Sequence, residues 1–125
     1  LGIESCVQFL GEVSDVKDEL KKSSCFVLSS DYEGLPNALM EAMAVGMPVI
    51  STDCPCGGPR MLIKQHENGI LVPCNDESKL AGAIIDIMSD KNKRIKFGIH
   101  AKQNAELFNT KVVMKRWYDY LFFEG

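Results

Sequence analysis

The chain has 125 residues and a mass of 13.9 kDa, which is the length of one compact domain. Hydrophobic residues make up 46% and charged residues 25%, ordinary globular proportions that exclude disordered, collagen-like and low-complexity chains. Lys and Arg number 14 and Asp and Glu 17, for a net charge of −3, so no overall positive field attracts a phosphate backbone. We therefore expect no nucleic-acid partner, and no apolar run reaches the ~20 residues of a membrane span.

The five cysteines predict reduced thiols. Their number is odd and no apolar signal segment precedes them, which argues against a disulfide framework and favours a reducing cytoplasm. Cys6 and Cys25 lie in apolar runs and are expected to pack as small hydrophobic residues. Cys54 and Cys56 form a C-x-C pair rather than the C-x₂-C of common zinc sites, so we expect no metal site and leave zinc as the open alternative.

Short apolar runs alternate with helical patterns along the first three-fifths of the chain, and only helical patterns follow. This order predicts a Rossmann-like three-layer α/β/α fold with a parallel sheet of about four strands, followed by C-terminal helices. The expected strands are residues 6–10, 25–29, 48–52 and 70–72. Ligands of open parallel sheets bind beyond the carboxyl ends of the strands. The loops at those ends are residues 11–15, 29–34, 53–58 and 73–76.

Capping residues and apolar periodicity delimit the helices. Ser14 or Asp15 can cap the first helix, and Asn75 or Asp76 can cap the first helix after the sheet. Gly46 is suited to end the second helix. The expected helices are residues 16–24, 35–45, 60–64, 76–88, 91–105 and a last one that begins at Asn109 or Thr110.

Residues 35–45 carry the most informative chemistry, because they form a helix that is apolar almost all round and is therefore expected to be buried. Glu41 is a polar exception on it, and Glu33 stands just before its start. A buried carboxylate is costly unless a group bonds to it, and no Lys or Arg lies between residues 22 and 60. The hydroxyl groups of a ribose or hexose would satisfy both carboxylates.

The start of the same helix predicts an anion seat. Backbone N–H groups of residues 34–38 point out of the helix, Gly34 permits close approach, and Pro36 suits the first helical position. An anion seat flanked by two hydroxyl acceptors fits a nucleotide diphosphate sugar. The residues alone leave two alternatives open: Glu33 could be a solvated loop carboxylate, and Glu41 could pair with a distant Lys or Arg.

Six ordered segments carry a resemblance to a known family, and it extends over nearly the whole chain from about Val7. They are residues 9–11, 33–37, 41–44, 46–50, 56–60 and 68–73. The sequence Glu33-Gly34-Leu35-Pro36-Asn37 and its companions resemble the retaining GT-B glycosyltransferases of the glycogen-synthase-like group (glycosyl transferases group 1, family 4). Bacterial members that assemble surface polysaccharides are the most similar.

The resemblance implies a partial C-terminal domain of a two-domain GT-B fold, so that residues 1–125 would be a single nucleotide-sugar-binding domain from a larger enzyme. It implies that Glu33 contacts the donor sugar as the catalytic-site carboxylate and that Glu41 binds the ribose hydroxyls. The implied diphosphate seat is Gly34, Leu35, Pro36 and Asn37, and the further candidates for donor contact are Ser30, Gly57 and Gly58.

The implied reaction transfers a sugar, with retention, from a UDP-sugar to an acceptor hydroxyl in bacterial polysaccharide or lipid-linked glycan synthesis. The glycan or lipid-linked acceptor would bind through the absent N-terminal domain, and no cofactor or metal would be needed. The fragment alone would be inactive. The full-length protein would be cytoplasmic, with peripheral association at the inner face of the plasma membrane. Two departures stand out: the family's phosphate-clamping basic pair is absent, and Met61 stands where relatives often have Glu.

Three other functions are to be compared with this one. A nucleotide-sugar-binding module without transferase activity and a GT-B sugar-nucleotide epimerase share the fold and the ligand. A receiver-type signalling domain would need acidic residues at the end of the first strand, where Leu10 and Gly11 stand. The last helix, around residues 117–123, is expected either to pack toward the partner domain or to form local core.

Overall fold

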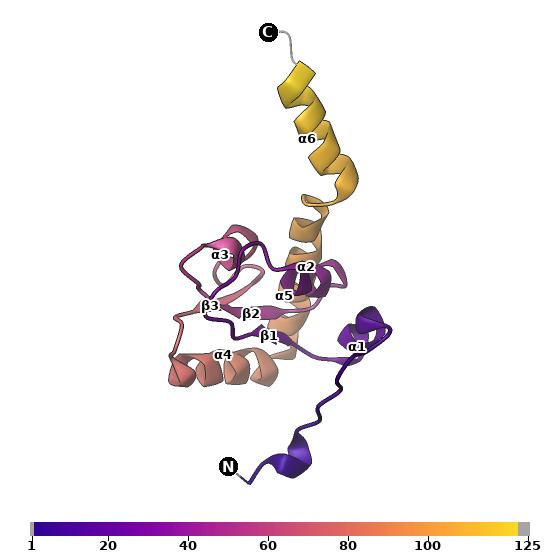
Figure 1. Cartoon of the computed structure of the whole chain (residues 1–125). Helices are drawn as coiled ribbons and strands as arrows, with labels where there is room; N and C mark the ends of the chain where they lie inside the picture. The colour runs from indigo at the N-terminus through magenta and orange to yellow at the C-terminus, as the bar shows by residue number, and fades with distance from the viewer. Residues whose placement is uncertain (1, 123–125) are drawn as a thin grey trace.

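A computed structural model describes residues 2–122. Its sheet has three parallel strands in the order β1-β2-β3, namely β1 (Phe26–Leu28), β2 (Val49–Thr52) and β3 (Gly69–Val72) (Figure 1). The helices are η1 (Glu4–Cys6), α1 (Val16–Lys22), α2 (Asn37–Ala44), α3 (Gly58–Leu62), α4 (Glu77–Ser89), α5 (Lys91–Glu106) and α6 (Thr110–Phe122).

Helices cover both faces of the sheet, as predicted for the α/β/α fold. Successive residues of β2 point to opposite faces, so Val49 joins a core with α2 and α5, while Ile50 joins a second core with α4. Figure 1 shows α4 on one side of the strands and α2 and α3 on the other. All four residues of β2 are buried because it is the central strand.

The predicted strand at residues 6–10 is wrong. Glu4–Cys6 form a short 3₁₀ helix and the next residues pair with no strand in the described range. Phe9 is 95% exposed, and Cys6 is exposed rather than packed as a small hydrophobic residue. An apolar run becomes a stable strand only when a neighbouring strand and a packing layer lie beside it. Within residues 2–122 the sheet therefore has three strands instead of about four.

The capping predictions are confirmed with one exception. The carboxylates of Asp15 and Asp76 accept the N–H groups of Asp18 and Lys79 at 3.0 and 2.9 Å. The side chain of Asn109 caps α6 in the same way, at 3.0 Å from the Val112 nitrogen. Gly46 follows α2 with a left-handed φ of 84°. Pro36 lies at the N-cap of α2, one residue before the helical position expected for it.

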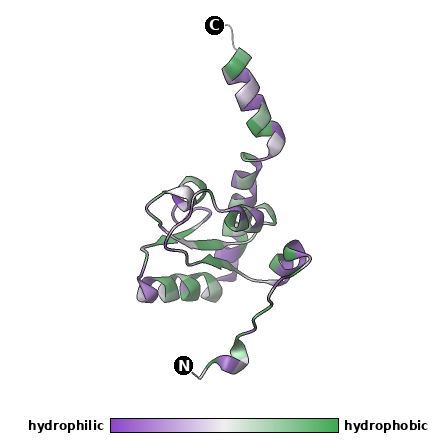
Figure 2. Cartoon of the chain, in the orientation of Figure 1, coloured by the Kyte–Doolittle hydropathy of each residue, from purple (hydrophilic) through white to green (hydrophobic). Residues whose placement is uncertain are grey.

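The last helix, α6, projects beyond the end of α5 and away from the sheet (Figure 1). Hydrophobic and hydrophilic residues alternate along its length (Figure 2). Trp117 and Tyr120 are 57% and 82% exposed, so the alternative in which these aromatic residues form local core is wrong. Residue 123, the end of the segment predicted as the last helix, lies outside the described residues. No helix among residues 2–122 is long and apolar enough to cross a membrane.

Candidate functional site

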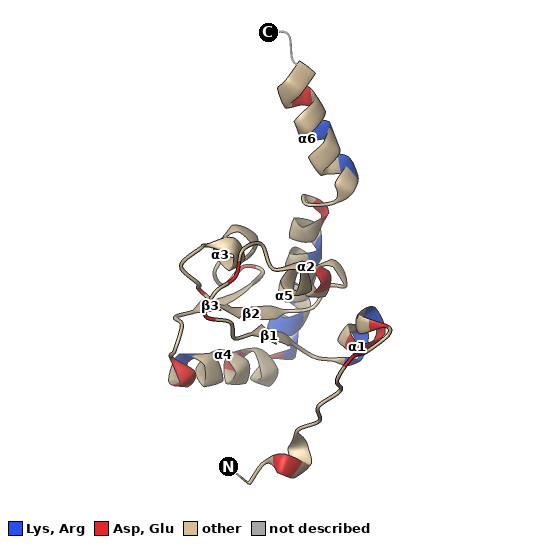
Figure 3. Ribbon diagram, viewed as in Figure 1, with Lys and Arg blue, Asp and Glu red and all other residues tan. Residues whose placement is uncertain are grey.

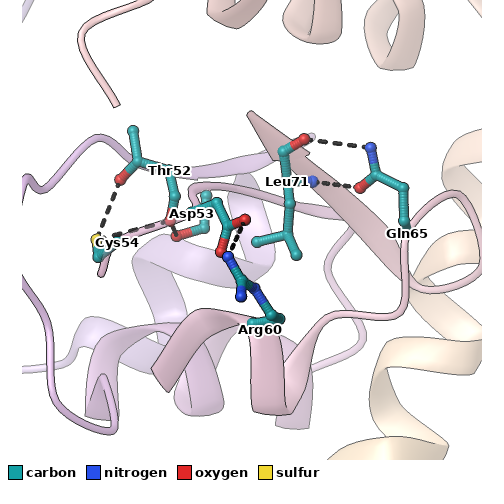
Figure 4. Close-up of polar contacts among 7 residues, drawn as sticks. Thr52, Asp53, Cys54, Arg60, Gln65 and Leu71 are labelled. Carbon is teal, nitrogen blue, oxygen red and sulfur yellow. Dashed lines mark hydrogen bonds and ion pairs between the residues drawn. The ribbon is translucent and has the colours of Figure 1, made fainter. Parts of the chain in front are cut away.

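The loops after β1 and β2 meet at the carboxyl edge of the sheet, where the fold predicts a ligand site. The backbone carbonyl of Ser30, just past β1, accepts hydrogen bonds from the Thr52 hydroxyl and from the Cys54 thiol, the latter at 3.0 Å. The Asp53 nitrogen donates to the Val72 carbonyl at 2.7 Å, which holds the end of β3 in the same place. Figure 4 shows the side chains of Thr52 and Cys54 next to each other, with that of Asp53 turned toward Arg60.

Glu33 lies in this edge and is half-buried. The Ser30 hydroxyl donates to the Glu33 Oε1 at 2.7 Å, so one carboxylate oxygen is fixed by the loop itself. The second oxygen has no partner among the described residues. Glu33 is thus an oriented carboxylate with one oxygen still open to accept a hydrogen bond.

The start of α2 follows directly and has no side-chain cap. By contrast, α1, α4 and α5 begin at Asp15, Asp76 and Asp90, each of which accepts a helical N–H group. An uncapped helix start leaves N–H donors for an anion and carries the positive end of the helix dipole. Within α2, Asn37 is exposed, so the predicted anion seat is open to solvent.

Glu41 is exposed, so the expectation of a costly buried carboxylate is wrong. Only the face of α2 that contacts the core is buried, through Leu39, Ala42 and Met43. The opposite face, which carries Asn37, Ala38, Glu41 and Ala44, is exposed, and the composition of the segment could not reveal this. Glu41 instead borders a groove of about 230 Å³ between α1 and α2, together with Lys17. Neither side chain forms an ion pair within the described part of the chain.

Gly57 and Gly58 have separate reasons to be glycine. Gly57 has a left-handed φ of 74° and forms the turn before α3. Gly58 is buried, and a Cβ on it would stand 1.4 Å from the Gly34 carbonyl oxygen. The backbones of the two loops therefore touch, and α3 begins directly against the segment that leads into α2. The sequence left a tight turn and a donor contact open; the turn and a loop-to-loop contact are what the structure shows.

Asp53 and Arg60 form a bidentate ion pair that the sequence did not predict (Figure 4). The Arg60 Nε and Nη2 atoms lie 2.9 and 2.6 Å from the two Asp53 carboxylate oxygens. The hydrogen bond and the charge of Asp53 raise the pKa of Arg60. Arg60 is the one Lys or Arg in residues 23–63, and Asp53 already occupies it. Lys22, which is nearer in sequence to the α2 start, is paired with Glu19. The other Lys and Arg residues lie mainly on α1, α5 and α6 (Figure 3).

The cysteines are free thiols in the structure. Burial, followed by the proximity of Cys54, raises the pKa of the Cys74 thiol. A hydrogen bond with Cys56 is the largest cause that raises the pKa of the Tyr32 hydroxyl. Within residues 2–122, no group of three or more His, Cys, Asp or Glu side chains is arranged to hold a metal ion.

The structure thus gathers part of the predicted site. Ser30, Glu33, Gly34 and Gly58 lie together, and the start of α2 adjoins them. Glu41 lies further along α2, in the α1–α2 groove. Sequence reasoning missed the roles of Thr52 and Cys54, whose bonds to Ser30 span 22 and 24 residues. No local signal marks contacts of that range.

The fold defines the class first: a Rossmann-like α/β domain of the GT-B glycosyltransferase kind. The structure superposes on Anabaena HepE in complex with UDP-glucose with a TM-score of 0.87 and 25% identity, over 97% of this chain and 33% of that one. A variant of S. aureus TarM, in a complex that contains UDP, gives a TM-score of 0.86 and 25% identity over 94% of this chain and 24% of that one.

The family follows from the sequence. The model of the family "Glycosyl transferases group 1" matches residues 1–104, and the chain belongs to this family.

Curated relatives extend the comparison. A Campylobacter jejuni α-1,4-N-acetyl-D-galactosaminyltransferase that acts on an undecaprenol-linked glycan is 35% identical over 94% of this chain and 32% of its own length. The lipopolysaccharide 1,6-galactosyltransferase of Salmonella typhimurium is 34% identical over 100% of this chain and 33% of its own. The exopolysaccharide phosphotransferase SCO2592 of Streptomyces coelicolor is 35% identical over 94% of this chain and 12% of its own length. The chain spans a third or less of each of these relatives.

Proposed function

We propose that this chain is the donor-binding part of a retaining glycosyltransferase and that its donor is a UDP-sugar. One observation carries the proposal: Glu33 is half-buried, its carboxylate is oriented by Ser30, and it lies immediately before the uncapped start of α2. The glycosyltransferases with this fold whose structures contain UDP or UDP-glucose support the choice of nucleotide.

In this proposal the donor sugar lies against Glu33. A carboxylate is an acceptor only, and the vicinal hydroxyls of a hexose are donors, so the free oxygen of Glu33 is matched to a sugar. The diphosphate lies at the start of α2, where Gly34, Leu35, Pro36 and Asn37 present backbone to it. A Cβ on Gly34 would meet nothing within 4 Å, so the space over that residue is open for a ligand.

The ribose lies at Glu41. Its position on α2, beyond the start of the helix, adds a second carboxylate to that of Glu33, and Glu41 is exposed in the groove between α1 and α2. Because Glu41 has no cationic partner in the described residues, its oxygens are available to both ribose hydroxyls. Ser30, Gly57 and Gly58 shape the loops around the donor rather than forming its main contacts.

Catalysis in this class rests on positioning and on stabilising the departing diphosphate. The bond from sugar C1 to the donor phosphate breaks, and C1 is delivered to an acceptor hydroxyl with retention. Arg60 is engaged by Asp53, so the cations that neutralise the diphosphate are proposed to come from the part of the protein outside these 125 residues. The acceptor, a glycan or lipid-linked glycan, is also proposed to bind to that part of the protein. The apolar residues of α6 are proposed to face the same part.

Titration of the chain with UDP and with UDP-glucose tests the proposal by calorimetry or NMR. We expect both to bind, with Glu41→Ala weakening UDP by about tenfold, as expected for the loss of hydrogen bonds to a charged group. The matched control is Glu106→Ala, an exposed glutamate at the end of α5. Absence of UDP binding, or equal weakening by both substitutions, contradicts the proposal.

Transfer is tested separately. The chain alone is expected to release no UDP from UDP-glucose in the presence of a glycan acceptor, while the longer protein does so. Efficient transfer by the 125 residues would show that the acceptor site and the phosphate-neutralising groups are already present in this chain.

A further inference from the structure

We propose that Cys54 is a positioning residue for Glu33, and that it acts, together with Thr52, by holding Ser30. This inference rests on the proposed function, because it concerns the carboxylate assigned there to the donor sugar. It adds a residue whose role is to aim that carboxylate rather than to touch the ligand.

The first step is the burial of the two donors. Thr52 is 4% exposed and Cys54 is fully buried, although each carries a polar hydrogen. A buried hydroxyl or thiol needs a hydrogen-bond acceptor. Both donate to the carbonyl of Ser30, whose two lone pairs can accept both hydrogens, and the Thr52 hydroxyl also lies 3.4 Å from the Leu28 carbonyl oxygen.

The second step is the place of that carbonyl. Ser30 lies two residues past the end of β1, where the ladder to β2 has stopped. The side chains of Thr52, the last residue of β2, and of Cys54, two residues beyond it, therefore replace the missing backbone bonds. They hold one peptide of the loop against the sheet. The Cys54 thiol is 3.0 Å from the Ser30 oxygen and 3.7 Å from its own alternative acceptor, the Thr52 carbonyl, which favours Ser30.

The third step links this anchor to Glu33. The same residue that accepts at its carbonyl donates through its hydroxyl to the Glu33 Oε1 at 2.7 Å. Fixing the Ser30 peptide fixes the origin of its side chain, and hence the direction of the bond to Glu33. The intervening residues, Asp31 and Tyr32, are exposed, so neither is held by burial in the core. The anchor from β2 therefore limits how far Glu33 can turn.

The test compares UDP with UDP-sugars, because a positioning role affects only the sugar part of the donor. The ratio of Kd for UDP to Kd for the best binder among UDP-glucose, UDP-galactose and UDP-N-acetylglucosamine measures that part. We expect Ser30→Ala and Cys54→Ala each to lower this ratio by about fivefold, of the order expected for a lost hydrogen bond. Cys54→Ser, which keeps a donor, should restore most of the ratio, and Kd for UDP alone should change less than about twofold.

The pattern of outcomes separates the two proposals. If Cys54→Ala weakens UDP and the UDP-sugar by the same factor, or weakens neither, the positioning role is overturned while the proposed function stands. If no UDP-sugar binds the unmodified chain more tightly than UDP, Glu33 makes no sugar contact and the positioning role fails. If UDP itself does not bind, the proposed function fails. Should Cys54→Ala not fold, Thr52→Val and Thr52→Ser provide the same comparison at the second donor, where the ratio should fall with valine and persist with serine.

Discussion

Gly58 lies against Gly34 so closely that a Cβ on Gly58 would stand 1.4 Å from the Gly34 carbonyl oxygen. The contact joins two loops that are 24 positions apart in the sequence and places the start of α3 against the approach to α2. A side chain at Gly58 must push this backbone away. At Gly34 the corresponding Cβ would meet nothing within 4 Å, so the two glycines of one contact differ in what they tolerate.

This difference gives the first prediction. Gly58→Ala should lower the free energy of unfolding by about 1–3 kcal/mol, the range for overpacking a close contact, measured by urea denaturation. Gly34→Ala should leave stability within about 0.5 kcal/mol, as an exposed substitution does, yet weaken UDP binding because the new methyl group occupies the space proposed for the diphosphate. Equal stability of the two variants would contradict the close contact, and unchanged UDP binding in Gly34→Ala would contradict the diphosphate seat.

The second prediction concerns the ion pair between Asp53 and Arg60. Its bidentate geometry requires a guanidinium, so Arg60→Lys should behave like Arg60→Ala rather than like the original residue. The Arg60 side chain is 65% exposed, so the loss of stability should be small and should shrink further in high salt. A double-mutant cycle with Asp53→Asn, followed by thermal denaturation at low and high salt, measures this coupling. A coupling that does not depend on salt would contradict this account.

The three strands of the sheet could be predicted because each is a local sequence pattern, a short apolar run between turn residues. Residues 25–29, 48–52 and 70–72 are short apolar runs bounded by turn residues, and each became a buried or half-buried strand. Residues 6–10 have the same pattern and did not. The pattern reports how hydrophobic a segment is, whereas pairing depends on a neighbouring strand, which no local pattern shows.

The candidate site was likewise predictable where its residues are adjacent in the sequence, and not where they depend on tertiary packing. Glu33, Gly34 and the start of α2 are adjacent in sequence, so their proximity follows from the chain itself. The exposure of Glu41 was not predictable, because it depends on which face of α2 receives a covering layer. The anchor at Ser30 was hidden for the same reason, since Thr52 and Cys54 reach it only after β1 and β2 pair.

The third prediction follows from the uncovered face of α6. Trp117 is 57% exposed, so Trp117→Ala in this chain should change the free energy of unfolding by less than about 0.5 kcal/mol. Phe97, an aromatic residue of α5 that is 2% exposed, is the matched control, and Phe97→Ala should cost about 3–5 kcal/mol. Chemical denaturation of both variants measures the contrast. A large loss of stability for Trp117→Ala would show that α6 packs on the body of this chain.

The fourth prediction concerns the pH dependence of stability. Burial raises the pKa of the Cys25 thiol from its usual 9.0 to about 11, an effect that the nearby charge of Arg94 partly opposes. Above pH 9 the unfolded chain loses this proton while the folded chain keeps it, so the unfolded state binds fewer protons and stability falls as the pH rises. The decline should run from about pH 9 to about pH 11 and then level off, because beyond the folded pKa both states are ionised.

The Cys25→Ser variant isolates this decline from the titration of other groups, because serine does not ionise in this range. Urea denaturation between about pH 8 and about pH 11 gives the free energy of unfolding of both chains. The value for the original chain minus the value for the variant should fall steadily as the pH rises through this interval. The same substitution at the exposed Cys6 is the matched control for replacing a cysteine with serine. A difference that stays constant with pH for Cys25→Ser would show that the thiol is solvated in the folded chain. In the structure, Cys25 and Val27 pack against the core cluster that contains Ile50 and Ile87. A constant difference would therefore mean that α4 covers this side of β1 less completely than the structure shows.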